Sequence, residues 1–160
     1  SIKSLKDALL GKLLSIETVH HPLNRSGETK GQIVGGNLSI LYSLIGSPSD
    51  LNTDGKILFI EDLDEYLYHI DRMMMNLKRS GKLSHLKGLI VGGMTKMNDN
   101  AIPFGKDAES IIKDIVSEYN YPVCFGFPAG HIKDNRALKM GVRAELKVYK
   151  QSSLNFEQSS

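Results

Sequence analysis

The stretch KILFIEDLDEYLYHIDRM, residues 56–73, contains the best candidate for a central strand of this chain. KILFI is a continuous apolar run, which is typical of a strand buried on both faces of a parallel sheet. Glu61 follows directly, where such a strand would end. Because ligands of open α/β sheets bind beyond the carboxyl ends of the strands, this carboxylate is a candidate site residue.

A second stretch, FGFPAGHIKDN at residues 125–135, places His131 in a similar position. The imidazole follows the strand pattern VCFGF and lies between Gly130 and a polar turn, so we expect it at a rim. A carboxylate and an imidazole at the same edge of a sheet could meet, and together they would form two thirds of a Ser-His-Glu triad.

The remaining pattern alternates between strands and helices. Apolar residues recur at helical spacing over 5–13, 38–45, 66–77 and 108–116, and strand patterns cover 16–21, 32–37, 88–94 and 123–127. Residues 138–149 alternate apolar and polar, which indicates a hairpin or a bulged antiparallel edge strand. We therefore predict an α/β fold, with a mostly parallel sheet covered by helices on both faces and antiparallel edge strands. Residues 1–150 would form one domain, and 151–160 a frayed polar tail.

Composition excludes several classes of function. The formal charge of +2 comes from alternating lysines and acids without a cationic stripe, which argues against a nucleic-acid partner. No apolar run approaches the roughly 20 residues that span a bilayer, and residues 1–12 lack a signal peptide's apolar centre. The single cysteine, Cys124, cannot form an intramolecular disulfide, which fits a reducing compartment. We expect a cytoplasmic protein without a membrane association.

Both stretches resemble motifs in the C-terminal half of the LD-carboxypeptidases, the serine peptidase family that includes muramoyl-tetrapeptide carboxypeptidase and the microcin C immunity protein. The resemblance implies a swivelling β/β/α-like C-terminal domain, with Glu61 orienting the catalytic histidine and His131 as the general base. The Gly-His pair followed by Asn135 matches the histidine motif, and GGNL at residues 35–38 resembles a motif near the cleft. The resemblance thus makes these supporting cleft residues: Gly35, Gly36, Asn37, Gly130 and Asn135.

The resemblance covers nearly the whole chain but only half of a typical family member. The nucleophile and oxyanion hole of the family belong to an N-terminal domain, which nothing in these residues matches. The implied partners are therefore that domain of the same parent chain, a peptide substrate and a second copy in a homodimer. The implied activity is release of terminal D-alanine from murein tetrapeptide, or hydrolysis of a microcin-type peptide, and this chain alone would be inactive.

Other interpretations of the acidic cluster and the serines remain. Glu61 or Asp62 could open the following helix, where an acid favours the N-terminal dipole. Asp62, Asp64 and Glu65 compete with Glu61 for the register of the glutamate motif. Ser49 in GSPSD follows a helix in a proline-containing loop, whereas a nucleophile elbow needs a strand, a sharp turn and a helix. We interpret Ser49 as a turn residue.

Glycine pairs at 35–36 and 92–93 lack the spacing of a Walker loop or a dinucleotide fingerprint. The first pair could hold an anion through free amides, or could serve close packing alone. His20 and His21 would point to opposite faces of a strand, so they cannot share a metal. We expect Met73–Met75 in the core, Cys124 buried and inert, and residues 98–100 in a solvated loop without calcium ligands. No metal or organic cofactor is implied.

Two functions from other classes stay open. The chain could be a stand-alone module that binds a peptide or an anion in the same crevice without turnover. It could also be a noncatalytic assembly domain, in which the apolar edge at residues 142–149 pairs with a second copy.

Overall fold

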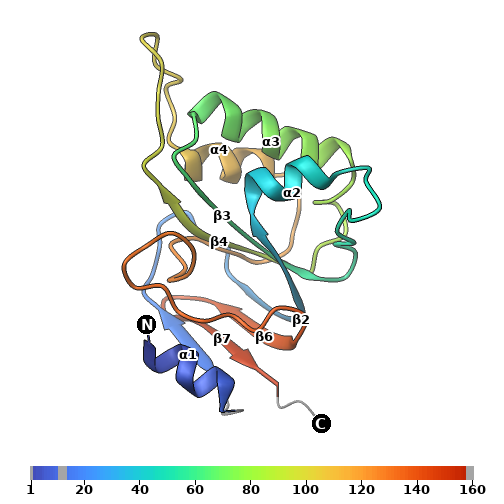
Figure 1. Ribbon diagram of the computed structural model, residues 1–160, viewed down its shortest axis with the longest axis vertical. Coiled ribbons are helices and arrows are strands. Elements are labelled where there is room, and N and C mark those ends of the chain that lie inside the picture. Colours follow the sequence, from blue (N-terminus) through green and yellow to red (C-terminus); the bar gives the residue numbers. More distant parts are fainter. Residues whose placement is uncertain (1, 11–13, 158–160) are drawn as a thin grey trace.

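The apolar run after Lys56 forms β3 (Ile57–Leu63), a strand in the middle of the sheet. The computed structural model describes residues 2–10 and 14–157 (Figure 1). Within them the strands form one sheet in the order β1-β7-β6-β2-β3-β4-β5. The parallel part comprises β2 (Gly27–Asn37), β3, β4 (Gly88–Thr95) and β5 (Val123–Cys124). The antiparallel part comprises β1 (Ser15–Thr18), β6 (Arg143–Val148) and β7 (Ser152–Phe156). The predicted α/β class, with a mostly parallel centre and added antiparallel strands, is confirmed.

The described helices are α1 (Ile2–Leu9), α2 (Leu38–Leu44), α3 (Leu67–Arg79) and α4 (Ala108–Ile115). The spacing of three and four predicted from the sequence is found in α3, whose buried side chains are Ile70, Met73, Met74 and Leu77. Met75 is 39% exposed, so the prediction that it lies in the core is wrong. Tyr66 precedes the helix, so the predicted helical spacing begins one residue too early. None of the described helices is long and apolar enough to cross a bilayer.

Two apolar clusters lie on opposite faces of the parallel strands, because side chains alternate along each strand. In β3, Leu58 and Ile60 belong to the cluster under α2, α3 and α4, whereas Ile57 and Phe59 belong to the other. The second cluster is completed by side chains of the antiparallel strands β6, β7 and β1. In this detail the arrangement differs from the predicted one: α2–α4 cover one face, and antiparallel strands cover the other.

Several predicted boundaries need correction. β2 begins at Gly27, inside a segment whose composition indicates turns, because its first half pairs with β6. β6 has β2 on one side and β7 on the other, so it is not an edge strand available to a second copy. Residues 152–156 are not frayed, since Ser152, Leu154 and Phe156 point inward from β7. The first helix ends at Leu9, and residues 11–13 of the predicted helix lie outside the described residues.

Asp107 caps α4, because its Oδ1 accepts a hydrogen bond from the Ser110 backbone N–H at 2.8 Å. Hydrogen bonds from Ser110 hold the pKa of the Asp107 carboxyl below its usual range. We expect Asp107→Ala to lower the free energy of unfolding by about 1 kcal/mol at neutral pH. Since the folded pKa is depressed, this stabilisation is present above the unfolded pKa and is lost as the pH falls through the folded value.

Urea unfolding at about pH 7 and about pH 3 tests this prediction, with Asp107→Asn as the control. Asparagine keeps the cap without the titrating charge, so its stabilising effect should persist in acid. If the free energy of unfolding of the wild type exceeded that of Asp107→Ala by the same amount at both pH values, the predicted pH dependence would be contradicted.

Candidate active site

Glu61 lies inside β3, at a bulge in the pairing of β3 with β4. Ile60 pairs with Val91 and Asp62 pairs with Met94, so Glu61 alone stands opposite two residues of β4. The prediction that the strand ends before Glu61 is therefore wrong, since β3 continues to Leu63. α3 begins only at Leu67, which excludes the interpretation of Glu61 as a residue of its first turn. The Glu61 side chain is 7% exposed, so its carboxylate needs hydrogen-bond partners.

His131 provides the closest of these partners. Its ring Nδ1 lies 2.7 Å from Oε2 of Glu61, and its backbone N–H donates to the same oxygen at 3.1 Å. Because a carboxylate only accepts hydrogen bonds, Nδ1 carries the proton and Nε2 is the nitrogen left to act as a base. The His131 side chain is 54% exposed, which leaves the ring accessible to a reacting group. The structure thus brings together the two residues that the sequence analysis ranked first.

The turn around His131 depends on Gly130, whose φ of +101° favours glycine. A Cβ atom at this position would lie 2.8 Å from both Cβ and Oε2 of Glu61. The Gly130 N–H donates to Oδ1 of Asn135 at 3.2 Å, which closes the turn after the histidine. Gly130 and Asn135 therefore hold the backbone that presents His131 to Glu61.

The glycine pair of β4 brings this backbone close to the sheet. Gly92 and Gly93 are the two residues opposite Glu61 at the bulge. A Cβ atom at Gly92 would lie 2.5 Å from the carbonyl oxygen of Ala129, and one at Gly93 would overlap Cγ2 of Ile132. The Gly93 N–H also donates to the Ala129 carbonyl at 3.0 Å. Side chains at either position would push the histidine segment away from β3.

The other glycine pair has a different role from the anion-binding turn that the sequence left open. Gly35 and Gly36 lie within β2 and pair with Phe59 and Ile60 of β3, so they form no turn. Asn37 ends the strand beside Glu61 and caps α2. Its side-chain amide donates to Oε1 of Glu61 at 3.4 Å. Of this group, Asn37 reaches the Glu61–His131 pair directly, and the two glycines position β2.

The competing acidic residues of the motif have other partners. Asp62 is 2% exposed and accepts a hydrogen bond from the Ser39 N–H at 2.9 Å, in the first turn of α2. Asp64 accepts a hydrogen bond from the side-chain amide of Asn98. Glu65 pairs with His69 at 2.8 Å, one turn along the chain. Glu61 is therefore the acid of this motif that contacts His131.

The remaining candidate residues lie away from the Glu61–His131 pair. Ser49 is exposed in a turn, where its N–H donates to Oγ of Ser47 at 3.2 Å. His20 and His21 follow β1, which ends at Thr18, so the prediction that they lie in a strand is wrong. His21 is half-buried, with its Nε2 3.1 Å from Oε2 of Glu109. Cys124 is buried, and burial raises the pKa of its thiol to about 11. Within the described residues, no cluster of histidine, cysteine and acidic side chains could hold a metal ion.

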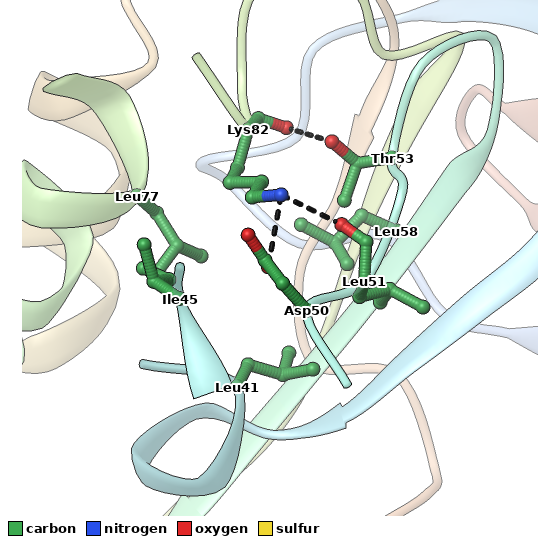
Figure 2. A pocket seen from close by; sticks show the side chains of 8 residues that line it. All are labelled: Leu41, Ile45, Asp50, Leu51, Thr53, Leu58, Leu77 and Lys82. Atoms are coloured by element: carbon green, nitrogen blue, oxygen red, sulfur yellow. Dashed lines mark hydrogen bonds and ion pairs between the residues drawn. The ribbon is translucent and has the colours of Figure 1, made fainter. Parts of the chain in front are cut away.

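A small cavity between α2, α3 and the loop after α2 lies under Leu41, Ile45 and Leu77 (Figure 2). Its volume is about 10 Å³, which is room for about one water molecule. Lys82 reaches in and donates to Asp50 Oδ1 and to a backbone carbonyl, both at 2.9 Å. The hydrogen bond from Lys82 to Asp50 lowers the pKa of the Asp50 carboxyl. The cavity is too small for a peptide substrate.

Sequence reasoning missed two features of the site. It assigned Gly92 and Gly93 only a rejected phosphate-binding motif, although they form the bulge opposite Glu61. It also treated Asp62 only as an alternative to Glu61, although both carboxylates are buried and in contact with Asn37. Two glycines at the end of a buried strand were a signal of close backbone approach. The contacts of Asp62 have no comparable local signal.

Comparisons with known proteins relate this chain to one protein family. Residues 30–146 match the family model of the LD-carboxypeptidase C-terminal domain. The chain is 35% identical over 132 residues to a probable murein peptide carboxypeptidase of Bacillus subtilis, covering 80% of this chain and 40% of that protein. It is 31% identical over 121 residues to the microcin self-immunity protein MccF of Escherichia coli, covering 74% of this chain and 34% of that protein.

A solved structure extends the likeness to the fold. The crystal structure of muramoyltetrapeptide carboxypeptidase from Oxalobacter formigenes superposes with a TM-score of 0.88 and 28% sequence identity. The superposition covers 99% of this chain and 55% of that chain. The chain thus spans about 40% of the length of the Bacillus subtilis relative and about half of the solved one. The chain belongs to the LD-carboxypeptidase family and corresponds to its C-terminal domain.

Proposed function

We propose that this domain supplies the acid-base half of a serine-type LD-carboxypeptidase, with His131 as general base and Glu61 as the residue that orients it. The observation that carries the proposal is the 2.7 Å contact between Nδ1 of His131 and Oε2 of Glu61. The buried carboxylate fixes the tautomer, and the half-exposed ring can receive a proton from a group outside the described residues.

The chemistry follows from this geometry. Nε2 of His131 removes the proton from a serine hydroxyl as the serine attacks the carbonyl carbon of the scissile amide. Glu61 stabilises the imidazolium that forms, and the imidazolium then protonates the leaving amine. Water hydrolyses the acyl-enzyme through the same base. Relatives named as murein peptide and murein tetrapeptide carboxypeptidases support a murein peptide as the substrate class. Within that class, the proposed bond joins an L-configured centre, such as that of meso-diaminopimelate, to a terminal D-alanine.

The nucleophile in this proposal belongs to an N-terminal domain of the same parent chain. Ser49, the serine whose sequence context superficially resembles that of a nucleophile, is a turn residue, and it follows α2 instead of a strand. The oxyanion hole would come from the same outside domain, so the 160 residues alone would have no appreciable activity. The proposal includes a cytoplasmic location and assembly as a homodimer. Because β6 is paired on both sides, the homodimer would not form through that strand.

An activity assay on two matched proteins tests this function. One is the 160-residue chain, and the other is the same chain joined to the nucleophile-bearing part of the Bacillus subtilis relative. Both are incubated with a murein tetrapeptide and with a serine-directed probe, and D-alanine release is measured. We expect release and labelling only in the joined protein. D-alanine release by the 160 residues alone would contradict the missing nucleophile, and a folded but silent joined protein that binds the peptide would favour the binding module.

A further inference from the structure

Asp62 is a second buried carboxylate beside Glu61, and the proposed chemistry does not use it. Counted over the whole residue, the exposed fraction of Asp62 is 2%, compared with 5% for Glu61. Burying a carboxylate is unfavourable unless hydrogen bonds replace its water. The Asp62 oxygens accept three hydrogen bonds, each at 2.9 Å, from the side-chain amide of Asn37 and from the N–H groups of Ser39 and Leu63. These three hydrogen bonds hold the Asp62 carboxylate in one orientation, so that it is a fixed point in the local structure.

Asn37 connects this fixed point to the candidate active site. Its side-chain oxygen accepts hydrogen bonds from Oγ of Ser39 at 2.7 Å and from the Ile40 N–H at 3.2 Å. Because the oxygen faces the start of α2, the NH₂ group of the amide faces the other way. That group donates to Asp62 at 2.9 Å and to Oε1 of Glu61 at 3.4 Å. One planar amide thus contacts the helix end and both carboxylates.

The two oxygens of Glu61 consequently have different partners. Oε2 accepts from the ring and the backbone N–H of His131, and Oε1 accepts from Asn37. Rotation of the carboxylate would break contacts at both ends. The orientation of the Glu61 carboxylate toward His131 therefore depends on the side-chain amide of Asn37. Of the two carboxylates that this amide contacts, Asp62 is the nearer, at 2.9 Å compared with 3.4 Å for Glu61.

We propose that Asp62 is a positioning residue, which acts through Asn37 to hold the Glu61 carboxylate in the orientation that meets His131. The inference rests on the proposed function for its catalytic meaning, because Glu61 matters there as the partner of the base. It adds a residue that touches neither His131 nor the reacting atoms in the proposed mechanism. Its effect is transmitted through two hydrogen bonds of one amide.

The tautomer of His131 is the readout, because a structural role alone would not move it. Nitrogen-15 NMR on the 160-residue chain, at a pH where the ring is neutral, distinguishes a proton on Nδ1 from one on Nε2. We expect the Nδ1–H form to dominate in the wild type. In Glu61→Leu the ratio of the two forms should shift toward Nε2–H by about tenfold or more, the effect of losing one charge-assisted hydrogen bond.

Two variants break the link at different points. Asp62→Asn replaces one acceptor oxygen with an NH₂ group. Both oxygens of Asp62 accept hydrogen bonds, so the NH₂ group faces an N–H donor in either orientation of the new amide. Asn37→Ser keeps a good helix cap but removes the bridging amide, so it remains informative if the first variant does not fold. Both should shift the ratio toward Nε2–H by roughly three- to tenfold. Asp64→Asn, an exposed change in the loop just after β3, is the control that should leave the ratio unchanged.

The outcomes separate this inference from the proposed function. A wild type without the Nδ1–H form, or a ratio unmoved by Glu61→Leu, would overturn the Glu61–His131 pair and with it the proposed function. A wild type with that form and a folded Asp62→Asn or Asn37→Ser variant with an unchanged ratio would overturn the positioning role alone. A shift in the folded variants, with none in Asp64→Asn, supports it.

Discussion

Replacing His131 by alanine in the joined protein is expected to lower the kcat of the proposed reaction by about 10⁴-fold, with a much smaller change in KM. The ring is the proposed base, and Oε2 of Glu61 accepts hydrogen bonds from its Nδ1 at 2.7 Å and from the His131 backbone N–H at 3.1 Å. Alanine removes the proton acceptor, whereas the substrate contacts made elsewhere remain. Steady-state kinetics of D-alanine release, in the joined protein described above, measures both parameters.

The matched control is His85→Ala. His85 is also a histidine beside a carboxylate, with its Nδ1 at 3.4 Å from Oδ1 of Asp54, but the two side chains are 73% and 66% exposed. It precedes β4, so it lies at the opposite end of the strand from Gly92 and Gly93. We expect the kcat of His85→Ala to stay within about twofold of the wild-type value, because an exposed ion pair contributes little to stability. A loss in His131→Ala no larger than in His85→Ala would exclude His131 as the base.

The central half of the fold could be predicted because its residues carry a local signal. Residues 57–60 of the KILFI stretch are all apolar, because both faces of the strand are buried. Leu58 and Ile60 pack under the helices, while Ile57 and Phe59 pack against side chains of the antiparallel strands. Such a run indicates a central strand without any knowledge of its neighbours. The run does not show where the strand ends, since β3 continues past Glu61 to Leu63.

The antiparallel end could not be predicted as well, because tertiary pairing outweighs local composition there. Ser152, Leu154 and Phe156 alternate inward along β7, but the serines and asparagine around them hide the period. The first half of β2 reads as a turn, yet Lys30 pairs with Glu145 of β6 at 3.4 Å across the sheet. Pairing with distant strands fixes both segments.

The site was predictable in its residues and not in its connections. The strand patterns placed Glu61 and His131 at a shared edge of the sheet, because carboxyl ends of neighbouring strands lie together. The resemblance to the LD-carboxypeptidases then selected these two residues over the helix-opening and surface interpretations. The bulge opposite Glu61 depends on a register shift between β3 and β4, which no single segment encodes. The contacts of Asp62 depend on where α2 begins relative to β3. These features exist only after the strands have paired.

Gly35→Ala is expected to lower the free energy of unfolding by roughly 4 kcal/mol or more, the largest effect on stability that we predict. The residue adopts a φ of +126°, and an added Cβ atom would overlap the carbonyl oxygen of Phe59 and lie 2.9 Å from its C and N atoms. These are backbone atoms of the paired strand, so they cannot rotate away. β2 and β3 would have to separate, with loss of their hydrogen bonds.

Gly36→Ala is the control, because its strain is similar and its surroundings differ. Gly36 has a φ of +153°, but an added Cβ atom would meet no heavy atom within 4 Å. We expect a loss of about 1–3 kcal/mol from backbone strain alone. Urea unfolding of both variants measures the difference, and equal losses would show that the approach of β2 to β3 does not require Gly35. A larger loss in Gly35→Ala would mean that the glycine pair serves the fold at the point where β2 delivers Asn37 to Glu61.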